Sequence, residues 1–243
     1  MSDPLFLLDR LDDPLPSAGT LVQLDGEEGR HAVVVRRLRA GESIILSDGA
    51  GRGLRGEIVE VGKSSLTMAV TEQLNTVESG PRYVVVQALA KGDRSELALE
   101  MLTEMGVHEV VPWQASRSIV RWSGERTEKS LSRWRSTVRE ATKQSRRLRV
   151  PVVSELVSST GLVDRIRHAD LALLLHEDAT TPLSQTELPV DGEVLIIVGP
   201  EGGISPEEVA AFAAAGADPV VISDGVLRTS TAGVVALAGL MLR

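Results

Sequence analysis

The chain from residue 80 onward contains short, almost uninterrupted apolar runs that alternate with segments of helical spacing. The runs are YVVVQAL (83–89), EVVPW (109–113), LALLL (171–175), VLIIV (194–198) and PVVIS (219–223). Strands that are apolar on both faces are typical of a parallel sheet with helices on each side. The alternation therefore predicts an α/β domain built on a parallel sheet.

The chain before residue 76 has a different pattern. Short β-like runs such as ESIILS and GEIVEV alternate there with turn residues, which predicts a small β-rich barrel or sheet. The polar stretch NTVESGP (75–81) separates the two patterns, so we predict one domain at 1–76 and a second at 80–243. DGAGRG (48–53) imitates a dinucleotide-binding loop, but strand-like sequence follows it, and a hairpin turn is predicted instead.

Composition narrows the possible chemistry. The 243 residues include no cysteine, which excludes disulfides, cysteine-based zinc sites and thiol nucleophiles. The four histidines lack metal-ligand spacing and there is no Gly-x-Ser-x-Gly elbow, so no metal site and no hydrolase triad is expected. The N-terminal apolar run is too short for a signal peptide or a membrane span. We therefore expect a cytoplasmic protein without membrane association.

One basic segment stands out in an acidic chain. The whole chain has a net charge of −8, yet residues 116–150 contain eleven Lys and Arg against three Glu. Within this segment the spacing of three and four predicts a helix with an apolar stripe, formed by Leu131, Trp134, Val138, Ala141, Ser145 and Leu148. Basic side chains lie along another side of the predicted helix. A solvated face is the plain interpretation, but charges of one sign favour a polyanionic partner.

The sequence VLIIVGPEGGISPEEV (194–209) predicts a strand, a glycine-rich turn and a helix. Ser205 and Glu208 form a capping box around Pro206 at the first helical position, and Gly216 marks the far end of the helix. The turn lacks a Lys and contains Glu201, so it is poorly suited to phosphate. A neutral or cationic ligand with hydroxyl groups, such as S-adenosylmethionine, fits better. A tight connection that binds nothing is the alternative.

Several motifs together resemble one known family. ALAKGDRSELALEMLTEMGVHEVVP, EATKQSRRLRVP, VGPEGGISPEEV and LRTSTA are similar to segments of the ribosomal RNA small-subunit methyltransferase E family, in the same order. The resemblance also includes HAVVVRRLRAGESIILSDG (31–49) and extends over essentially the full chain. There are departures: Ser230 stands where the family usually has a Glu, and Arg36 where it usually has a Leu, whereas Arg37 matches.

The resemblance implies a SPOUT-type parallel sheet with a C-terminal trefoil knot, preceded by a small PUA-like β-barrel that binds RNA. It also implies methylation of N3 of a uridine in 16S ribosomal RNA of the small subunit, with S-adenosylmethionine as the cofactor and a homodimer as the working form. Knots are otherwise very rare, so this expectation depends on the resemblance alone. The alternative function is a non-catalytic RNA-binding protein on the same fold.

The resemblance and the position of three loops after strand ends predict the residues of the two binding sites. The cofactor is expected at Leu175, His176, Val198, Gly199, Pro200, Glu201, Gly202, Gly203, Ile222, Ser223, Asp224, Gly225, Val226, Leu227, Thr231 and Ala232. The RNA is expected along His31, Arg37, Lys91, Arg94, Arg117, Arg139, Lys143, Gln144 and Arg146.

Two residues are candidates for catalysis. Methylation of uracil N3 removes a ring proton and leaves negative charge on the flanking carbonyl oxygens, which requires a nearby cation and a proton acceptor. Arg228 is the candidate for the cation, with a salt bridge in the knot or dimer interface as its alternative role. Glu201 is a candidate for the acceptor, with water as its rival. Glu201 could instead only hold the loop or the cofactor hydroxyls.

Overall fold

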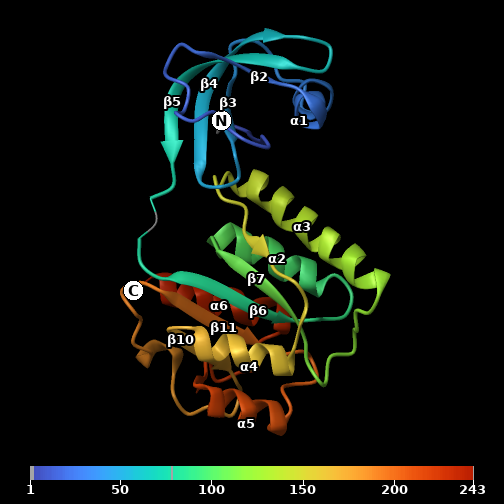
Figure 1. Cartoon of the computed structure of the whole chain (residues 1–243), viewed down its shortest axis with the longest axis vertical. Helices are drawn as coiled ribbons and strands as arrows, with labels where there is room; N and C mark the ends of the chain where they lie inside the picture. Colours follow the sequence, from blue (N-terminus) through green and yellow to red (C-terminus); the bar gives the residue numbers. More distant parts are fainter. Residues whose placement is uncertain (1–2, 78, 243) are drawn as a thin grey trace. The chain divides into compact units, whose positions relative to one another are not determined.

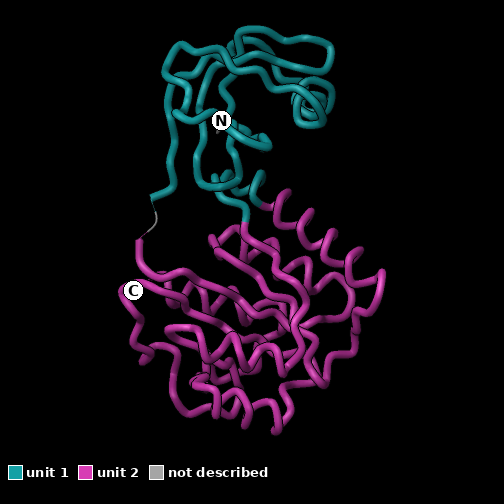
Figure 2. The backbone as a smooth tube through the Cα atoms, viewed as in Figure 1, with its two compact units in different colours: residues 1–78, 142–150 teal, residues 79–141, 151–243 magenta. Residues whose placement is uncertain are grey.

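The computed structural model describes residues 3–77 and 79–242 and divides into two compact units (Figures 1 and 2). Unit 1 comprises residues 1–78 and 142–150, and unit 2 comprises residues 79–141 and 151–243. The predicted second domain, 80–243, includes residues 142–150, whereas in the structure this segment belongs to unit 1. Leu148 and Val150 pack on Leu5, Leu7 and Ile45, which explains why this segment belongs to unit 1.

Unit 1 is a five-stranded sheet with the strand order β1-β3-β4-β5-β2. Its elements are β1 (Leu5–Leu7), β2 (Leu21–Leu24), α1 (Gly26–Arg30), the π-helical turn η1 (His31–Val35), β3 (Ser43–Ser47), β4 (Arg52–Val61) and β5 (Leu66–Asn75). Pairing among the described residues ends at β1 and β2, so the expected barrel is a curled half-barrel. Phe6, Leu24, Ile44 and Met68 lie in its core. β3 and β4 pair antiparallel, which confirms the hairpin at 48–53.

Unit 2 contains a seven-stranded parallel sheet, which confirms the predicted fold class. Its main path has the order β12-β10-β11-β6-β7-β8, and β9 pairs with β7. The strands are β6 (Arg82–Ala88), β7 (Glu109–Gln114), β8 (Val152–Val153), β9 (Val157–Ser158), β10 (Leu171–Leu175), β11 (Glu193–Val198) and β12 (Ala217–Val220). Four of the five apolar runs therefore form strands close to the predicted bounds.

The fifth run, 219–223, is shifted. The strand β12 occupies Ala217–Val220, and Val221 makes only an isolated bridge with Pro182. β12 is an edge strand that pairs only with β10, and Pro219, which has no N–H to donate, is tolerated at an edge. The predicted strand at 219–223 was thus placed too far along the chain, and Ile222 and Ser223 lie in the loop that follows.

Helices cover both faces of the sheet. They are α2 (Arg94–Met105), α3 (Glu125–Ser145), α4 (Ser159–His168), α5 (Pro206–Ala215) and α6 (Thr229–Met241), with a short helical turn η2 (Leu183–Gln185). Val84 and Val86 of β6 share a core with Leu162 of α4 and Phe212 of α5. On the opposite face α6 packs with α2 and approaches the sheet closely, because Gly233 leaves room for Val85 and Val198.

The predicted helix in the basic segment is α3. Leu131, Trp134, Val138 and Ala141 are buried along it, as the stripe predicts. The stripe does not continue to Leu148, because the helix ends at Ser145 and Arg146 adopts a left-handed conformation with φ of 57°. The backbone N–H groups of Arg146 and Arg147 then donate to carbonyls of the last helical turn, as in a Schellman motif.

None of the helices among the described residues is long and apolar enough to cross a bilayer. The trefoil knot concerns the threading of the backbone, and it stays a prediction.

Candidate active site

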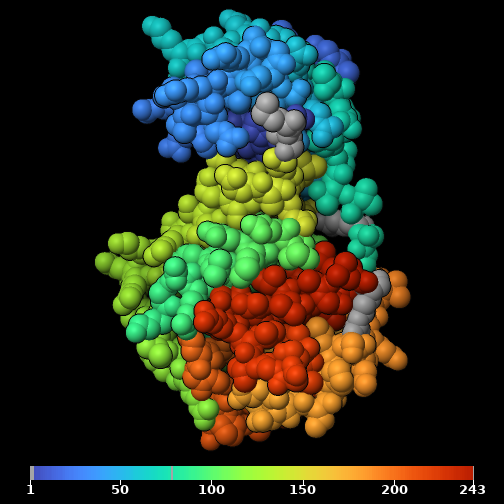
Figure 3. All heavy atoms as spheres, turned by 180° about the vertical axis from the view of Figure 1, so that it is seen from behind, coloured from blue at the N-terminus to red at the C-terminus, as the bar shows by residue number. Residues whose placement is uncertain are grey.

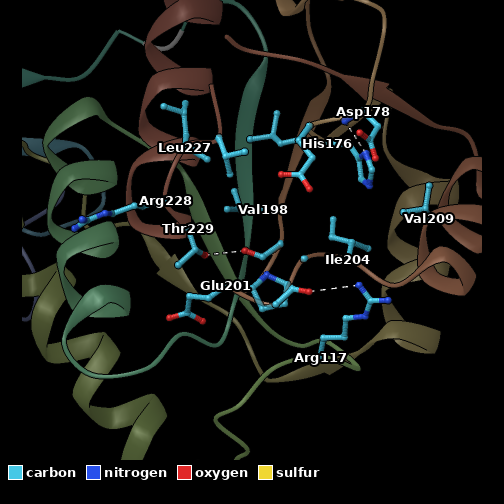
Figure 4. Close-up of a pocket in the computed structure, with 18 of the residues that line it drawn as sticks. Arg117, His176, Asp178, Val198, Glu201, Ile204, Val209, Leu227, Arg228 and Thr229 are labelled. Carbon is cyan, nitrogen blue, oxygen red and sulfur yellow. Dashed lines mark hydrogen bonds between the residues drawn. The ribbon is translucent and has the colours of Figure 1, made fainter. Parts of the chain in front are cut away.

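A cavity of about 970 Å³ lies in unit 2 at the carboxyl ends of β10, β11 and β12. Three loops surround it: the residues after β10, the glycine-rich turn after β11, and the segment between β12 and α6 (Figure 4). This is the edge at which open parallel sheets bind their ligands. The volume is at the upper end of the range for small-molecule sites.

The glycine-rich turn is held from both sides. On the helix side, the Ser205 hydroxyl accepts from the backbone N–H of Glu208 at 3.2 Å, and the Glu208 carboxylate accepts from the backbone N–H of Ser205 at 3.1 Å, which confirms the capping box. On the strand side, the Thr229 hydroxyl donates to the Gly199 carbonyl at 2.8 Å (Figure 4). Buried Gln87 in turn donates to the Thr229 hydroxyl at 3.0 Å.

Glycine is needed in the turn for space. A Cβ at Gly199 would lie 2.6 Å from Cγ1 of Ile204, and one at Gly202 would lie 3.2 Å from the carbonyl oxygen of Arg117. Gly203 has a φ of +73°, where a side chain would strain the backbone. The turn thus brings its backbone close to the cavity, so that its N–H and C=O groups can contact a ligand directly.

Most of the predicted cofactor residues line the cavity. They are Leu175, His176, Val198, Gly199, Pro200, Glu201, Gly202, Gly203, Ile222, Gly225, Val226, Leu227 and Ala232. Three predicted residues do not line it: Ser223, Asp224 and Thr231. The Ser223 hydroxyl instead closes a local turn, since it donates to the carbonyl of Gly225 at 2.8 Å.

The sequence prediction missed one wall of the cavity. Pro206, Val209, Ala210 and Ala213 line it from one face of α5, Ile204 from the loop before α5, and Thr229 from the first turn of α6. The spacing of three, four and seven along α5 was a usable signal, because these residues must share a helix face. Glu177 and Asp178, which directly follow His176, also line the cavity.

Charged side chains in the cavity are segregated. Asp178 lies beside His176 on one side in Figure 4, and Glu177, between them in sequence, also lines the cavity. Arg228 and Glu201 lie on the opposite side in Figure 4, and Arg94 and Arg117 also line the cavity. Glu201 pairs with Arg94 at 3.1 Å, whereas none of the described residues forms an ion pair or hydrogen bond with the Arg228 guanidinium. The cavity therefore has an acidic side that suits a cationic ligand, whereas its other side carries both cations and the Glu201 carboxylate.

The ionisation of Glu201 bears on its predicted roles. Burial raises the pKa of this carboxyl, but hydrogen bonds from its own backbone N–H, from the Lys91 backbone N–H and from Arg94 lower the pKa further, so the net shift is downward. A carboxylate with a lowered pKa is a weaker proton acceptor.

The predicted RNA residues belong to both units. In unit 1, Arg37, Gln144 and Arg146 are exposed. Lys143 is different: its side chain is only 8% exposed, and its Nζ lies 3.1 Å from Glu28 Oε1 and 3.5 Å from His31 Nδ1. A buried, paired ammonium group is a poor phosphate ligand, so Lys143 is placed to hold η1 near the last turn of α3.

In unit 2, Lys91, Arg94 and Arg117 are exposed near the glycine-rich turn, and Arg139 is half-buried on α3. Arg117 donates to the carbonyl oxygen of Gly202 at 3.4 Å (Figure 4). Three predicted RNA residues therefore lie at the margin of the cavity. Among the described residues no group of three or more His, Asp or Glu side chains could hold a metal ion.

Comparison with known proteins agrees with this arrangement. The sequence model of an RNA methyltransferase domain matches residues 78–241, and that of an RNA methyltransferase PUA domain matches residues 24–70. The chain is 44% identical to ribosomal RNA small subunit methyltransferase E of Mycobacterium tuberculosis over 229 residues, covering 93% of this chain and 87% of the relative.

Two solved structures are also similar. Ribosomal RNA small subunit methyltransferase E from Neisseria gonorrhoeae, bound to S-adenosyl methionine, has a TM-score of 0.85 and 27% identity over 99% of this chain and 98% of that one. A methyltransferase from Legionella pneumophila in complex with the same cofactor has a TM-score of 0.82 and 27% identity over 100% and 98%. The chain belongs to the ribosomal RNA small subunit methyltransferase E family, with an RNA methyltransferase domain that follows a PUA domain.

Proposed function

We propose that this protein uses S-adenosylmethionine to methylate N3 of a uridine in 16S ribosomal RNA of the small ribosomal subunit, in the cytoplasm. The observation that carries the proposal is the cavity formed by three loops around a turn in which a Cβ at Gly199 would clash with Ile204 and one at Gly202 would crowd Arg117. A chain that only bound RNA would have no use for this cradle. The relatives crystallised with the cofactor support the same ligand.

The cavity suits the cofactor chemically. S-adenosylmethionine supplies a methyl group on a positively charged sulfur, and it also carries ribose hydroxyls and an ammonium group. The backbone of the turn and the side chains of Glu177 and Asp178 supply acceptors for those groups. The apolar side chains of Leu175, Val198 and Ile222 supply a surface for the adenine. A phosphate ligand would instead be repelled by the carboxylates, and the turn has no lysine to offset that repulsion.

Arg228 is the residue that we propose stabilises the reacting uracil. It lines the cavity, although its guanidinium points away from the centre of the cavity in Figure 4, so the side chain must turn toward the bound uracil. None of the described residues pairs with this guanidinium, and an arginine stays charged at any working pH. Its cation can therefore stabilise the negative charge that develops on the uracil carbonyl oxygens as N3 loses its proton. The acceptor of that proton is Glu201 or water. The contacts of Glu201 with Arg94 and Lys91 reduce its basicity, which favours water.

We propose RNA contacts at His31, Arg37, Gln144 and Arg146 of unit 1 and at Lys91, Arg94, Arg117 and Arg139 of unit 2, with Lys143 supporting His31. Contacts of Lys and Arg with phosphates supply affinity that depends steeply on salt. Charge reversal at Arg139 and Arg146 should therefore weaken RNA binding and flatten its salt dependence. An affinity that does not change with salt would contradict this set of contacts.

We also propose that the protein works as a homodimer. Val235 and Met241 on α6 are 38% and 40% exposed, and α6 lies beside α2 on one surface of unit 2 (Figure 3). Exposed apolar side chains on an otherwise buried helix favour a contact with a second copy. Sedimentation at micromolar concentration should find a dimer in the unmodified protein. A monomer at that concentration would contradict the proposal.

The function is tested with purified protein, radiolabelled S-adenosylmethionine and two substrates, unmodified 16S ribosomal RNA and small subunits that contain it. We expect calorimetric binding of the cofactor and transfer of one methyl group to uridine N3. The position of the methyl group is read by mass spectrometry of nucleosides. Cofactor binding without transfer to either substrate would contradict the substrate assignment. The absence of cofactor binding would favour a non-catalytic RNA-binding protein.

A further inference from the structure

The loop between β6 and α2 carries two exposed cations, Lys91 and Arg94, at the margin of the cavity. The base of the loop is anchored, because the backbone N–H of Ala90 donates to the hydroxyl of buried Ser95 at 3.2 Å. Its tip reverses direction at Gly92, which has a φ of +73°. The tip is therefore a short projection whose position depends on contacts beyond its own base.

Glu201 supplies the contacts at the tip. Its Oε1 accepts from the backbone N–H of Lys91 at 3.0 Å and from Nη1 of Arg94 at 3.1 Å. Within the described part of the chain, these two donors have no other partner. The Glu201 side chain is 19% exposed and that of Arg94 is 45% exposed. An exposed ion pair alone contributes little, but a second bond to the backbone fixes the loop as well as the side chain.

A second cationic loop contacts the same turn. Arg117 donates to the carbonyl oxygen of Gly202 at 3.4 Å, and its neighbour Ser116 donates to the Glu208 carboxylate from both its backbone N–H and its hydroxyl, each at 2.8 Å. The segment from Gly199 to Glu208 thus contacts both loops that present cations at the margin of the cavity. Any change in the shape of the turn must move or release those cations.

Two roles are open to a carboxylate in this position. A proton acceptor would need an oxygen directed at the substrate and a basicity that suits the operating pH. Oε1 of Glu201 already bonds to two donors of the loop, and in Figure 4 the side chain lies on the side of the cavity away from His176. The geometry matches an anchor between two segments that are 110 residues apart in sequence.

We propose that Glu201 is a positioning residue that fixes Lys91 and Arg94 against the cofactor turn, so that a bound cofactor strengthens the binding of RNA. This proposal rests on the proposed function. The bound cofactor holds the turn in one conformation. Glu201, which is part of the turn, then fixes the position of the loop, so that Lys91 and Arg94 are already in place when the RNA binds. A ligand that orders a segment needed by a second ligand produces positive cooperativity.

The test compares the RNA affinity with and without S-adenosylhomocysteine, a cofactor analogue that has no methyl group to transfer. For the unmodified protein we expect saturating analogue to tighten RNA binding at least about fivefold. In Glu201→Gln, saturating analogue should no longer tighten RNA binding, so the ratio of the two RNA affinities should be about one. Glu207→Gln, which removes the same charge from the same segment without contacting the loop, should keep the full gain.

Variants at Arg94 break the same contact from the other side. Arg94→Gln should abolish the gain, and Arg94→Lys, which keeps a cation able to reach Glu201, should restore part of it. The double variant Glu201→Gln with Arg94→Gln should lose no more of the gain than either single variant, because the two residues act as one unit. A full gain in Glu201→Gln, or additive losses in the double variant, would contradict the proposal.

The pH dependence of single-turnover methylation separates positioning from proton transfer. A positioning residue leaves the shape of the profile unchanged in Glu201→Gln, whereas loss of a proton acceptor removes the limb that its titration causes. An altered profile would therefore overturn the proposal. An unmodified protein that binds both ligands independently and still methylates RNA would contradict only the positioning role. An unmodified protein that does not bind the analogue would contradict the proposed function as well.

Discussion

The two ends of the parallel sheet in unit 2 differ in how completely their charged side chains are paired. At the amino ends of the strands, Arg82, Glu109 and Glu193 form a network with Arg165 of α4, and every member has at least one partner of opposite sign. At the carboxyl ends, Arg228 has no such partner among the described residues and the turn is built from glycines. The difference separates the end that holds the fold together from the end that binds ligands.

The closed network also shows how burial and pairing compete. The Glu109 side chain is only 7% exposed, and burial raises its pKa. Hydrogen bonds from Arg165, Ser154 and Arg82 lower it more strongly, so the pKa of Glu109 is about 2. Arg228 has no comparable partner among the residues that the structure describes. A cation without a protein partner has its charge available for a substrate, which is what a site for a developing anion requires.

Removing the unpaired cation should have the largest effect. We expect Arg228→Ala to reduce the single-turnover rate of methylation about 100-fold to 1,000-fold, because one donor is lost where negative charge develops. The affinity for S-adenosylmethionine, measured by calorimetry, should change by less than about threefold. The reason is that Arg228 is proposed to stabilise the transition state of the reacting uracil and not to bind the cofactor. A normal rate in this variant would show that Arg228 has another role, such as an ion pair in the dimer.

Opening the network at the other end should change stability instead of activity. Glu109→Gln removes a buried carboxylate, whereas Arg165 and Arg82 are 28% and 40% exposed and keep Glu193 as a partner. We therefore expect a loss of about 2 kcal/mol in the free energy of unfolding, as for a lost hydrogen bond to a charged group. Urea denaturation measures this loss. The methylation rate per folded molecule should stay the same. A lower methylation rate without a loss of stability would contradict the assignment of the amino ends of the strands to stability alone.

The same residue predicts a response to acid. Its pKa in the folded state, about 2, lies below the ordinary value of 4.5. Ionised Glu109 therefore stabilises the fold at pH values above about 4.5, and this contribution is lost as the pH falls from about 4.5 to about 2. Denaturation curves over that range should show a shallower loss of stability in Glu109→Gln than in the unmodified protein.

Adding one carbon to the glycine-rich turn should reduce cofactor affinity. The new Cβ of Gly199→Ala must displace Ile204, which lies 2.6 Å away, and we expect the affinity for S-adenosylmethionine to fall at least about tenfold, or about 1.4 kcal/mol. Gly161→Ala in α4, whose nearest neighbour would lie at 3.7 Å, is the matched control. Ile204→Ala in the Gly199→Ala chain should recover part of the affinity. Unchanged binding in Gly199→Ala would remove the turn from the site.

The sequence predicted best the features that depend on neighbouring residues. The capping box of Ser205 and Glu208 and the strand at 171–175 were found because a few adjacent residues determine them. The contact of Glu201 with Lys91 could not be found, because only the folded sheet brings residues so distant in sequence together. The end of α3 was also missed, since the residue that turns the chain there is Arg146 and not a glycine.

The smallest effect on stability is expected at Arg146 of unit 1, a basic residue in the left-handed conformation. A residue with a side chain at φ of 57° costs about 1 kcal/mol relative to glycine, so Arg146→Gly should stabilise the protein by about that amount. If the strain is tolerated because the arginine binds phosphate, the same variant should weaken RNA binding and reduce the slope of log affinity against log salt by about 0.7 to 0.9. Denaturation and a salt titration measure the two quantities. Greater stability with an unchanged salt slope would show that Arg146 does not contact the RNA.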